Sequence, residues 1–466
     1  MTHTTIDPRV ADPRTVELRI GAPAHGGHCV ARHEGRVVFV RHALPGELVR
    51  ARLTECAEEA RFWRADTVEV LEASEHRVAH FWAAADALAA AAAGRAPVGG
   101  AEFGHAELGH QRELKGRIFR EQLVRLGRTD PDAAGFAGVE VPDGERADGL
   151  GWRTRAAFSV DDAGRLAMNA FRSNELVPVR EMPLAVDAVN ALRLWELPLR
   201  GLARVEVAVP SDGGAPLVLF VEHDGGTPGL ADRAAKRLAE GVSAAAITQK
   251  GGSASDGRGT LRRLRGRTWL GERAAGHAYR VTGEGFWQIH RLAADTLAAA
   301  VLQDLDPRPG QRLADLYAGA GLFTAPLADA VGDAGLVLSI EGAPGTSRDA
   351  RRNLHGVPQA LVLQGRVEKT LAKSLQERAL AEGTEAGGRL DGVVLDPPRT
   401  GAGKMAVRQI AQAGPARISY VSCDPASFAR DVADFGRQGY RLEKVRVLDL
   451  YPHTHHMETV GLLVRA

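Results

Sequence analysis

Two stretches near the end of the chain carry reactive side chains directly after predicted strands. Residues 392–395 are followed by Asp396 and two prolines, and residues 418–422 are followed by Cys423, Asp424 and a proline. Because proline cannot continue a central strand, each turn should hold its polar side chains at the rim of a sheet. Asp396 would there reach a cofactor or a planar base. A cysteine at a strand end, taken alone, is usually a small buried hydrophobe.

A glycine-containing turn follows an earlier predicted strand. Gly319 and Gly321 allow the backbone to pass close to a ligand. A dinucleotide-binding turn would carry a third glycine at position 324, which is threonine here, so a smaller adenosine cofactor fits better. Glu341 ends the next predicted strand, where a carboxylate can accept hydrogen bonds from ribose hydroxyls. An N-cap or an exposed acid is the alternative for Glu341.

The C-terminal segment 449–458 contains three histidines, His453, His455 and His456. No second ligand set stands at a recognisable spacing, so this cluster does not predict a metal site. Glu458, which directly precedes the last predicted strand, is instead a candidate base.

The elements that must position these residues alternate between strand and helix. The predicted strands cover residues 312–316, 336–340, 360–363, 392–395, 418–422, 445–449 and 459–464. Several are continuous apolar runs, as in strands covered on both faces, and the pattern predicts a doubly wound parallel sheet. Ligands of such sheets bind outside the carboxyl ends of the strands.

The N-terminal part of the chain has a different pattern. Alternating runs at 16–20, 36–40, 48–53 and 65–70 predict a small antiparallel barrel over residues 15–74, after a disordered tail of residues 1–14. Residues 75–281 are predicted to form a mixed α/β central domain with a helix at 105–128, and residues 282–466 form the last domain. The alanine-rich stretch 83–94 is predicted to be helical or a loose insertion.

Two basic segments could contact phosphate groups. The densest is residues 261–267, which contains Arg262, Arg263 and Arg265 and follows a predicted mobile loop at 251–259. The predicted helix at 105–128 also carries a basic face that is expected to be exposed, although such a face is usually only solvated. Its members are Arg112, Lys115, Arg117, Arg120 and Arg125.

Composition limits the class of protein. A length of 466 residues favours about three domains, and 44% hydrophobic residues match a globular protein. The net charge of +1 gives no global sign of nucleic-acid or membrane binding. Three cysteines form no disulfide framework, so a reducing, cytoplasmic setting is expected. No membrane span is predicted, and a monomer is expected.

Together these motifs resemble the S-adenosylmethionine-dependent RNA (uracil-5-)methyltransferases, the 5-methyluridine enzymes with an N-terminal TRAM domain. The matching segments are Asp315-Leu316-Tyr317-Ala318-Gly319-Ala320-Gly321, Asp396-Pro397-Pro398-Arg399-Thr400-Gly401, Tyr420-Val421-Ser422-Cys423-Asp424-Pro425, the segment from Tyr451 to Val460, and Phe286-Trp287-Gln288-Ile289-His290. The resemblance spans nearly the whole chain. It implies a Rossmann-like class I methyltransferase domain, an OB-like TRAM barrel that binds RNA, and a mixed α/β central domain.

The resemblance also implies roles for individual residues. Cys423 would be the nucleophile and Glu458 the general base. RNA, either tRNA or rRNA, would be the partner, held by the barrel and the segment 258–267, with Phe286 as a further substrate contact. The residues that match the family's S-adenosylmethionine site are Gln288, Tyr317, Glu341 and Asp396, beside Gly319 and Gly321.

Methylation at uracil C5 requires these residue types. C5 is too weak a nucleophile to take a methyl group from a sulfonium directly, whereas addition of a thiolate to C6 makes it reactive. The surroundings of Cys423 are therefore expected to lower the pKa of its thiol. Glu458 would then remove the C5 proton so that the thiolate can leave. The target base must also be flipped out of any stack.

The sequence departs from the family pattern at several positions. Many relatives hold an iron–sulfur cluster with four cysteines, and no cluster is expected here. Arg366 stands where relatives often place an acid near the adenine, so altered cofactor affinity is expected. Asp424 replaces a common asparagine, and nothing in the sequence explains that change. The residues at the cluster positions are Val78, Val98, Ala101 and Met182.

Other functions are weighed against this one. A cytosine-5 or other base methyltransferase could use the same scaffold, although enzymes that methylate exocyclic amines favour an aromatic residue at the position of Arg399. A non-catalytic RNA-binding protein could also descend from it. An NAD-dependent oxidoreductase fits least, because Thr324 breaks the dinucleotide fingerprint.

Overall fold

The computed structural model describes residues 14–171, 173–248, 261–382 and 388–466. The predicted tail, apart from residue 14, and the predicted loop at 251–259 lie outside the described residues. The chain divides into two compact units. The first comprises Met1–Ile118, Asn169–Val177 and Pro452–His455, and the second comprises Phe119–Met168, Pro178–Tyr451 and His456–Ala466. The predicted boundaries near residues 74 and 281 stay predictions.

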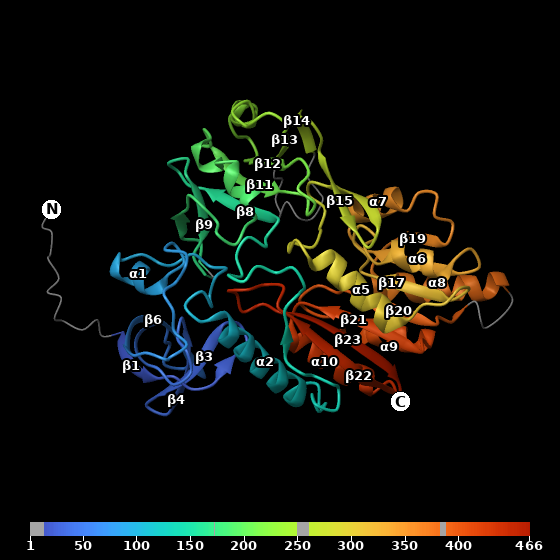
Figure 1. The fold of residues 1–466 in the computed structure, drawn as a ribbon, viewed down its shortest axis with the longest axis horizontal. Helices are drawn as coiled ribbons and strands as arrows, with labels where there is room; N and C mark the ends of the chain where they lie inside the picture. The colour runs from blue at the N-terminus through green and yellow to red at the C-terminus, as the bar shows by residue number, and fades with distance from the viewer. Residues whose placement is uncertain (1–13, 172, 249–260, 383–387) are drawn as a thin grey trace, which may run out of the picture. The chain divides into compact units, whose positions relative to one another are not determined.

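A six-stranded barrel forms the core of the first unit, with strand order β1-β5-β6-β4-β3-β2. The N–H of Gly21 donates to the Val30 carbonyl at 2.7 Å, which joins the chain after β1 to β3 and closes the sheet. Val38, Val40 and Val49 are fully buried inside it. The strands are β1 (Thr15–Arg19), β2 (Pro23–Ala24), β3 (His28–His33), β4 (Arg36–Arg41), β5 (Leu48–Glu55) and β6 (Phe62–Glu72) (Figure 1).

The predicted barrel is confirmed, but it is not wholly antiparallel. Strands β4 and β6 run parallel, whereas β5 pairs antiparallel with β6 on its other side. The sequence pattern also missed β3, in which Val30 alone is a strong strand former.

Two helices follow the barrel in the chain, α1 (Ala87–Ala92) and α2 (Leu108–Arg125). The alanine-rich stretch is therefore helical only in part, starting after Asp86, whose carboxylate caps α1. The prediction that Lys115 is exposed on the second helix is wrong, because Lys115 is fully buried. It shares the buried helical stripe of Gln111, Leu114 and Ile118, at the spacing of one helix face.

A seven-stranded mixed sheet, in the order β10-β9-β8-β11-β12-β13-β14, occupies the middle of the chain and confirms the predicted mixed α/β architecture. Within it, β12 and β13 run parallel and α4 connects them. The strands are β8 (Arg155–Val160), β9 (Leu166–Asn169), β10 (Leu176–Pro178), β11 (Leu202–Ala208), β12 (Leu217–Glu222), β13 (Ser243–Thr248) and β14 (Leu261–Arg265). The helices are α3 (Asp187–Ala191), η1 (Leu194–Glu196) and α4 (Leu230–Ala235), and a hairpin of β15 (Trp269–Ala274) and β16 (His277–Thr282) follows.

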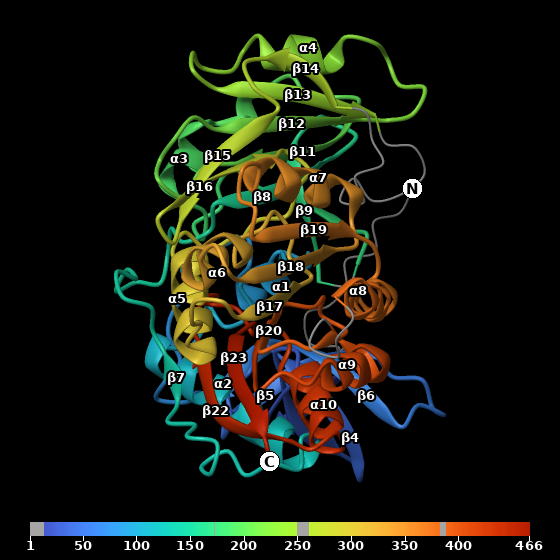
Figure 2. The same ribbon diagram turned by 90° about the vertical axis from the view of Figure 1, so that its right-hand side faces the viewer.

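An eight-stranded sheet, in the order β19-β18-β17-β20-β21-β23-β22-β7, forms the rest of the second unit. Helices α5 and α6 cover one face, and α8, α9 and α10 cover the other (Figure 2). The strands are β7 (Val139–Glu140), β17 (Arg312–Leu316), β18 (Leu336–Glu341), β19 (Ala360–Gln364), β20 (Gly392–Leu395), β21 (Arg417–Ser422), β22 (Tyr440–Leu448) and β23 (Glu458–Arg465). The helices are α5 (Ala293–Leu305), α6 (Thr324–Val331), α7 (Pro344–Asn353), α8 (Val367–Glu382), α9 (Gly403–Ala413) and α10 (Pro425–Gly436).

The predicted parallel sheet holds from β17 to β21, but the sheet as a whole is mixed. Strand β23 runs antiparallel to both of its neighbours, β21 and β22. A short connection between β22 and β23 permits this, whereas a parallel pair would need a long crossover. As a result, the start of β23 meets the carboxyl ends of β20 and β21 at one rim.

Candidate active site

Cys423 lies at this rim, between the end of β21 and the start of α10. The carboxylate of Asp424 caps the helix and accepts hydrogen bonds from the Ser427 N–H at 2.8 Å and hydroxyl at 3.0 Å. Pro425 occupies the first turn, where its missing N–H costs nothing. Asp424 therefore has a structural role that the sequence did not reveal, and Cys423 is left half-buried beside the helix N-terminus.

Glu458 is the neighbour of Cys423 across the strand pair. Ser422 of β21 and Thr459 of β23 are register partners, so the residues just beyond them, Cys423 and Glu458, stand side by side. The Glu458 side chain is buried, and the Tyr451 hydroxyl donates a hydrogen bond to its Oε2 at 2.9 Å. Burial and the charge of Asp396 raise the pKa of Glu458 well above its ordinary value.

Asp396 completes this group at the end of β20. The side-chain amide of Gln288 donates to Asp396 Oδ2 at 3.3 Å, so two residues that the family resemblance assigns to the cofactor site are in contact. Burial, followed by the nearby Asp315 carboxylate, raises the pKa of Asp396 to about 7. The rim therefore concentrates acids that bind protons more tightly than they do in water.

The expectation that the surroundings lower the pKa of Cys423 is wrong for this structure. Burial, and then the charges of Glu458 and Asp396, raise the pKa of the thiol to about 12. The guanidinium of Arg399 acts in the opposite direction, and it is the cation that stabilises both the Cys423 thiolate and the Glu458 carboxylate. At rest, the cysteine is a neutral thiol.

The turn after β17 leaves space beside its backbone. Tyr317 and Gly319 have positive φ angles of 64° and 56°, and a Cβ added at Gly319 would meet no atom within 4 Å. At Gly321 an added Cβ would approach the Leu354 side chain at 3.2 Å. Gly319 therefore borders open space, whereas Gly321 permits close packing of the following segment against α7 and its end.

Glu341 fixes the geometry of this turn. One of its carboxylate oxygens accepts the Gly319 N–H at 2.8 Å, and the other accepts the Ala343 N–H at 2.5 Å. Its side chain thus joins the turns that follow β17 and β18. Its assignment to a ribose stays a prediction.

Thr324 has a structural role in place of the missing third glycine. It is fully buried, and its hydroxyl donates to Asp315 Oδ2 at 2.6 Å. Burial raises the pKa of Asp315 to about 7. Open space at Gly319, an aromatic ring at Tyr317 and the acids Glu341 and Asp396 fit an adenosine-type cofactor better than a dinucleotide.

Comparisons with known proteins agree with this architecture. Residues 273–466 match the family described as tRNA (Uracil-5-)-methyltransferase, and residues 13–66 match the TRAM domain. An uncharacterized RNA methyltransferase of Streptomyces avermitilis is 40% identical over 96% of this chain and 97% of its own length. Another, from Bifidobacterium longum, is 35% identical over 96% of each chain. This chain belongs to the TRAM-containing RNA (uracil-5-)methyltransferase family.

A solved structure shares the fold of this family member. The crystal structure of Pyrococcus abyssi tRNA (uracil-54, C5)-methyltransferase in complex with S-adenosyl-L-homocysteine superposes with a TM-score of 0.69 at 21% identity, covering 96% of this chain and 99% of that one. At this identity the likeness concerns the fold.

Sequence reasoning assigned no role to several residues of the methyltransferase rim. Tyr451 and Arg399 stand inside the quoted motifs, but only the structure relates them to Glu458 and Cys423. Trp152 lies far away in the sequence, where no motif marks it. Trp152 packs edge-on against Tyr451, with 5.8 Å between ring centroids.

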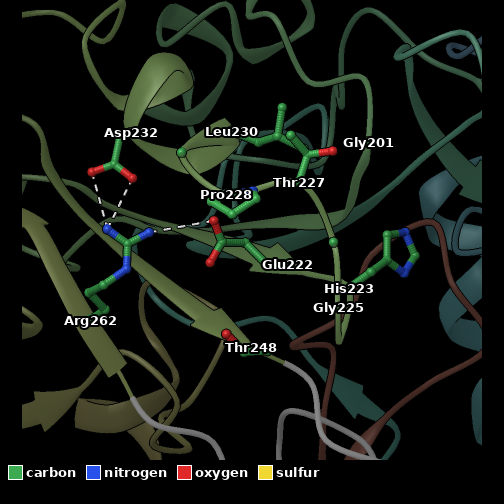
Figure 3. A pocket seen from close by; sticks show the side chains of 12 residues that line it. Gly201, Glu222, His223, Gly225, Thr227, Pro228, Leu230, Asp232, Thr248 and Arg262 are labelled. Atoms are coloured by element: carbon green, nitrogen blue, oxygen red, sulfur yellow. Dashed lines mark hydrogen bonds and ion pairs between the residues drawn. The ribbon is translucent and has the colours of Figure 1, made fainter.

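The predicted RNA-contacting arginines differ in their surroundings. Arg262 forms ion pairs with Asp232 at 3.0 Å and Glu222 at 3.5 Å, beside a cavity of about 440 Å³ between the β12–β14 strand ends and α4 (Figure 3). Arg265 donates to backbone carbonyls, including that of Val242 at 2.9 Å. The Arg263 side chain is exposed. Arg262 and Arg263 are both exposed, and the ion pairs of Arg262 already balance its charge, so Arg263 is the better candidate for phosphate contact.

Phe286 and Arg366, two further predicted positions, lie on the surface of the methyltransferase. Phe286 is 60% exposed, which suits a predicted substrate contact. Arg366 pairs with Glu368 through a 2.6 Å hydrogen bond, so an acid stands two residues after the position where relatives carry one. Both charges act on Tyr317.

The positions that match the cluster cysteines are packed differently from one another. Val98, Ala101 and Met182 are buried, whereas Val78 is 39% exposed. Within the described residues, no group of three or more His, Cys, Asp or Glu side chains could hold a metal ion. Across those same residues, every helix is too short or too polar to cross a membrane.

Proposed function

We propose that this protein transfers a methyl group from S-adenosylmethionine to C5 of a uridine in RNA. Cys423 is the nucleophile and Glu458 is the general base. The observation that supports this proposal is the pairing of a thiol and a buried carboxylate across β21 and β23, at the rim that also carries Asp396 and the open turn at Gly319.

The proposed reaction needs a bond that forms and then breaks. The Cys423 thiolate adds to C6, and the C5–C6 π electrons move toward O4 to give an enolate whose C5 is nucleophilic. When bound, S-adenosylmethionine would supply an electrophilic methyl group to C5, and the electrons of the broken sulfur–methyl bond would stay on its sulfur. Glu458 takes the C5 proton, the electrons of that C–H bond restore the C5–C6 double bond, and the S–C6 bond breaks to release the thiolate.

The electrostatics of the rim favour the base and oppose ionisation of the nucleophile. A carboxylate with a raised pKa accepts a proton more readily than a solvated one, which suits Glu458 as a base. The thiol must ionise against the influence of two acids, and Arg399 is the cation that favours the thiolate. Arg399 is exposed, so an incoming RNA strand can reach it.

The outer face of the barrel suits an RNA partner. Phe39 and Phe62 meet edge to face at 5.2 Å, and the Arg64 guanidinium lies 5.0 Å from the Phe62 ring centroid. Phe62 is 39% exposed. Aromatic rings beside arginines can stack bases and attract phosphates of single-stranded RNA. Both tRNA and rRNA are compatible with this surface.

Substitution of the nucleophile tests the proposal. Cys423→Ala should abolish methyl transfer and covalent trapping by RNA that contains 5-fluorouridine, because no thiolate can add to C6. Cys56→Ala, at a cysteine of the barrel region, should retain both activities. Transfer is measured with radiolabelled S-adenosylmethionine, and trapping is measured as a denaturation-resistant complex. Retained trapping in Cys423→Ala would overturn the proposal.

A further inference from the structure

Tyr451 is linked directly to the proposed base. It lies in the loop between β22 and β23, and its hydroxyl donates to Glu458 Oε2 at 2.9 Å. A hydrogen bond to Oε2 holds that oxygen in place and thereby restricts the orientations open to the carboxylate. Hydrogen bonds to a charged acceptor are among the stronger ones in proteins.

A stack of buried side chains packs against the ring of Tyr451. Trp152 is fully buried and packs edge-on against the Tyr451 ring. The other side of Trp152 stacks on His290, with 5.6 Å between centroids and 17° between planes. His290 Nδ1 accepts the Leu292 N–H at 3.1 Å, so its proton is on Nε2, which lies 2.6 Å from Glu145 Oε2. Ring packing therefore places Trp152 between Tyr451 and His290.

We propose that Tyr451 is a positioning residue that orients the Glu458 carboxylate and favours its anionic form during removal of the C5 proton. This inference rests on the proposed function, because it assumes that Glu458 is the base. Tyr451 acts through Glu458 and not on the RNA itself.

The charges around Glu458 indicate that its hydrogen bond with Tyr451 affects its ionisation. Asp396, from the end of β20, opposes ionisation of Glu458, and Cys423 faces it from the end of β21. Tyr451 and Arg399 favour the carboxylate. Loss of the Tyr451 hydroxyl leaves Arg399 to act against burial and Asp396. The base should then ionise only at higher pH.

Tyr451→Phe removes the hydroxyl and keeps the ring that packs on Trp152. The test uses RNA tritiated at uracil C5 and follows tritium release in single turnovers between pH 6 and pH 9. We expect about tenfold slower release near pH 7 and a pH midpoint about one unit higher, as the loss of a charged hydrogen bond predicts. Adduct formation with 5-fluorouridine RNA, which needs Cys423 but no C5 proton removal, should be unchanged.

A matched control removes another tyrosine hydroxyl of the same sheet. Tyr440, on β22, donates to the Pro415 carbonyl at 2.8 Å, and Tyr440→Phe should leave the pH midpoint of tritium release unchanged. An unaltered midpoint in Tyr451→Phe would overturn the inference.

A second variant keeps the inference testable if Tyr451→Phe does not fold. Tyr451→3-fluorotyrosine retains the ring and strengthens the hydroxyl as a donor, so it should move the midpoint to lower pH. A midpoint that stays in place would also overturn the inference. The outcomes separate the two proposals, because failure of the proposed function would appear as wild-type protein that forms no adduct at Cys423.

Discussion

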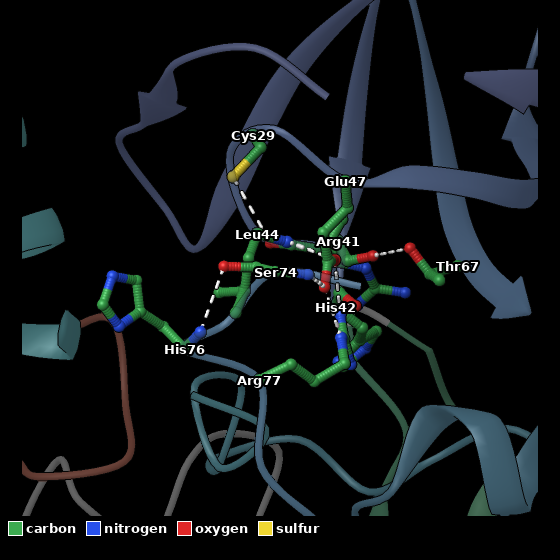
Figure 4. Close-up of polar contacts among 10 residues, drawn as sticks. Cys29, Arg41, His42, Leu44, Glu47, Thr67, Ser74, His76 and Arg77 are labelled. Atoms are coloured by element: carbon green, nitrogen blue, oxygen red, sulfur yellow. Dashed lines mark hydrogen bonds and ion pairs between the residues drawn. The ribbon is translucent and has the colours of Figure 1, made fainter. Parts of the chain in front are cut away.

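Two buried glutamates, one in each compact unit, have opposite electrostatic surroundings. In the first unit, Glu47 is fully buried, and Arg77 donates two hydrogen bonds to its carboxylate, at 2.6 Å and 2.7 Å. The N–H groups of Leu44 and Ser74 donate to the same carboxylate (Figure 4). In the second unit, Glu458 is just as inaccessible, yet it accepts from a neutral hydroxyl and faces the acid Asp396.

The difference separates a structural acid from a reactive one. A carboxylate matched by a guanidinium and backbone donors ties together the segments that supply those donors. A buried carboxylate beside another acid has a raised pKa, and groups of this kind concentrate at functional sites. Burial alone therefore does not distinguish the two, whereas the charge of the partner does.

The largest effect is expected at Glu458. Glu458→Gln should slow turnover by about a thousandfold, within the range that general bases contribute. The covalent RNA adduct should accumulate, because the C5 proton can no longer leave. Gel analysis of denatured RNA–protein complexes measures that accumulation. A Glu458→Gln variant with wild-type turnover would show that Glu458 is not the base.

The counterpart change at Glu47 should act on stability. Glu47→Gln leaves the Arg77 guanidinium buried without its countercharge, which typically costs about 3–5 kcal/mol. Urea titration should show this loss, while the rate of methyl transfer per folded molecule stays as in the wild type. A stable Glu47→Gln variant with impaired chemistry would contradict the structural role.

A third buried acid, Asp315, should make the stability of the protein depend on pH. Burial raises the pKa of its carboxyl to about 7, so the folded protein binds this proton more tightly than the unfolded chain does. The resulting stabilisation is complete below about pH 4 and is lost as the pH rises through 7. The asparagine in Asp315→Asn is uncharged at every pH. The wild type should therefore lose about 2–4 kcal/mol of its free energy of unfolding, relative to Asp315→Asn, between pH 4 and pH 8.

Urea midpoints at several pH values test this expectation. Asp162→Asn, at an exposed aspartate, serves as the control. Parallel pH dependences of the wild type and Asp315→Asn would mean that Asp315 does not bind a proton in this range.

Motifs identified the rim, but they did not reveal its electrostatics. Proline after β20 and β21 marked Asp396 and Cys423 correctly as strand-end residues, since proline leaves a local signature in the sequence. The raised pKa of Cys423 comes first from burial and then from acids on two other strands, and neither has a signature along the chain.

The same limit applies to the rest of the fold. The sequence pattern predicted a strand for each one from β17 to β23, and several of them are continuous apolar runs. The antiparallel direction of β23 instead depends on the loop that joins it to β22. Lys115 was assigned to a solvated face because lysine is usually exposed, although its position in the helix repeat belongs to the buried stripe.

The smallest effect is expected at the exposed arginines of β14. Arg262 and Arg263 are both exposed, but Arg262 is paired with Asp232 and Glu222. The pair of Arg77 and Glu47 is its buried counterpart. Arg263→Ala should lower the salt dependence of RNA binding by about one phosphate contact, with cofactor affinity unchanged. Arg262→Ala should change that slope less, because its charge is already balanced within the protein. Filter binding between 50 and 200 mM salt, as for other phosphate contacts, measures both slopes. Equal salt dependences for the two variants would show that an arginine in an internal ion pair can still bind RNA. The charge of a residue's partner would then not predict which arginines of this surface contact RNA.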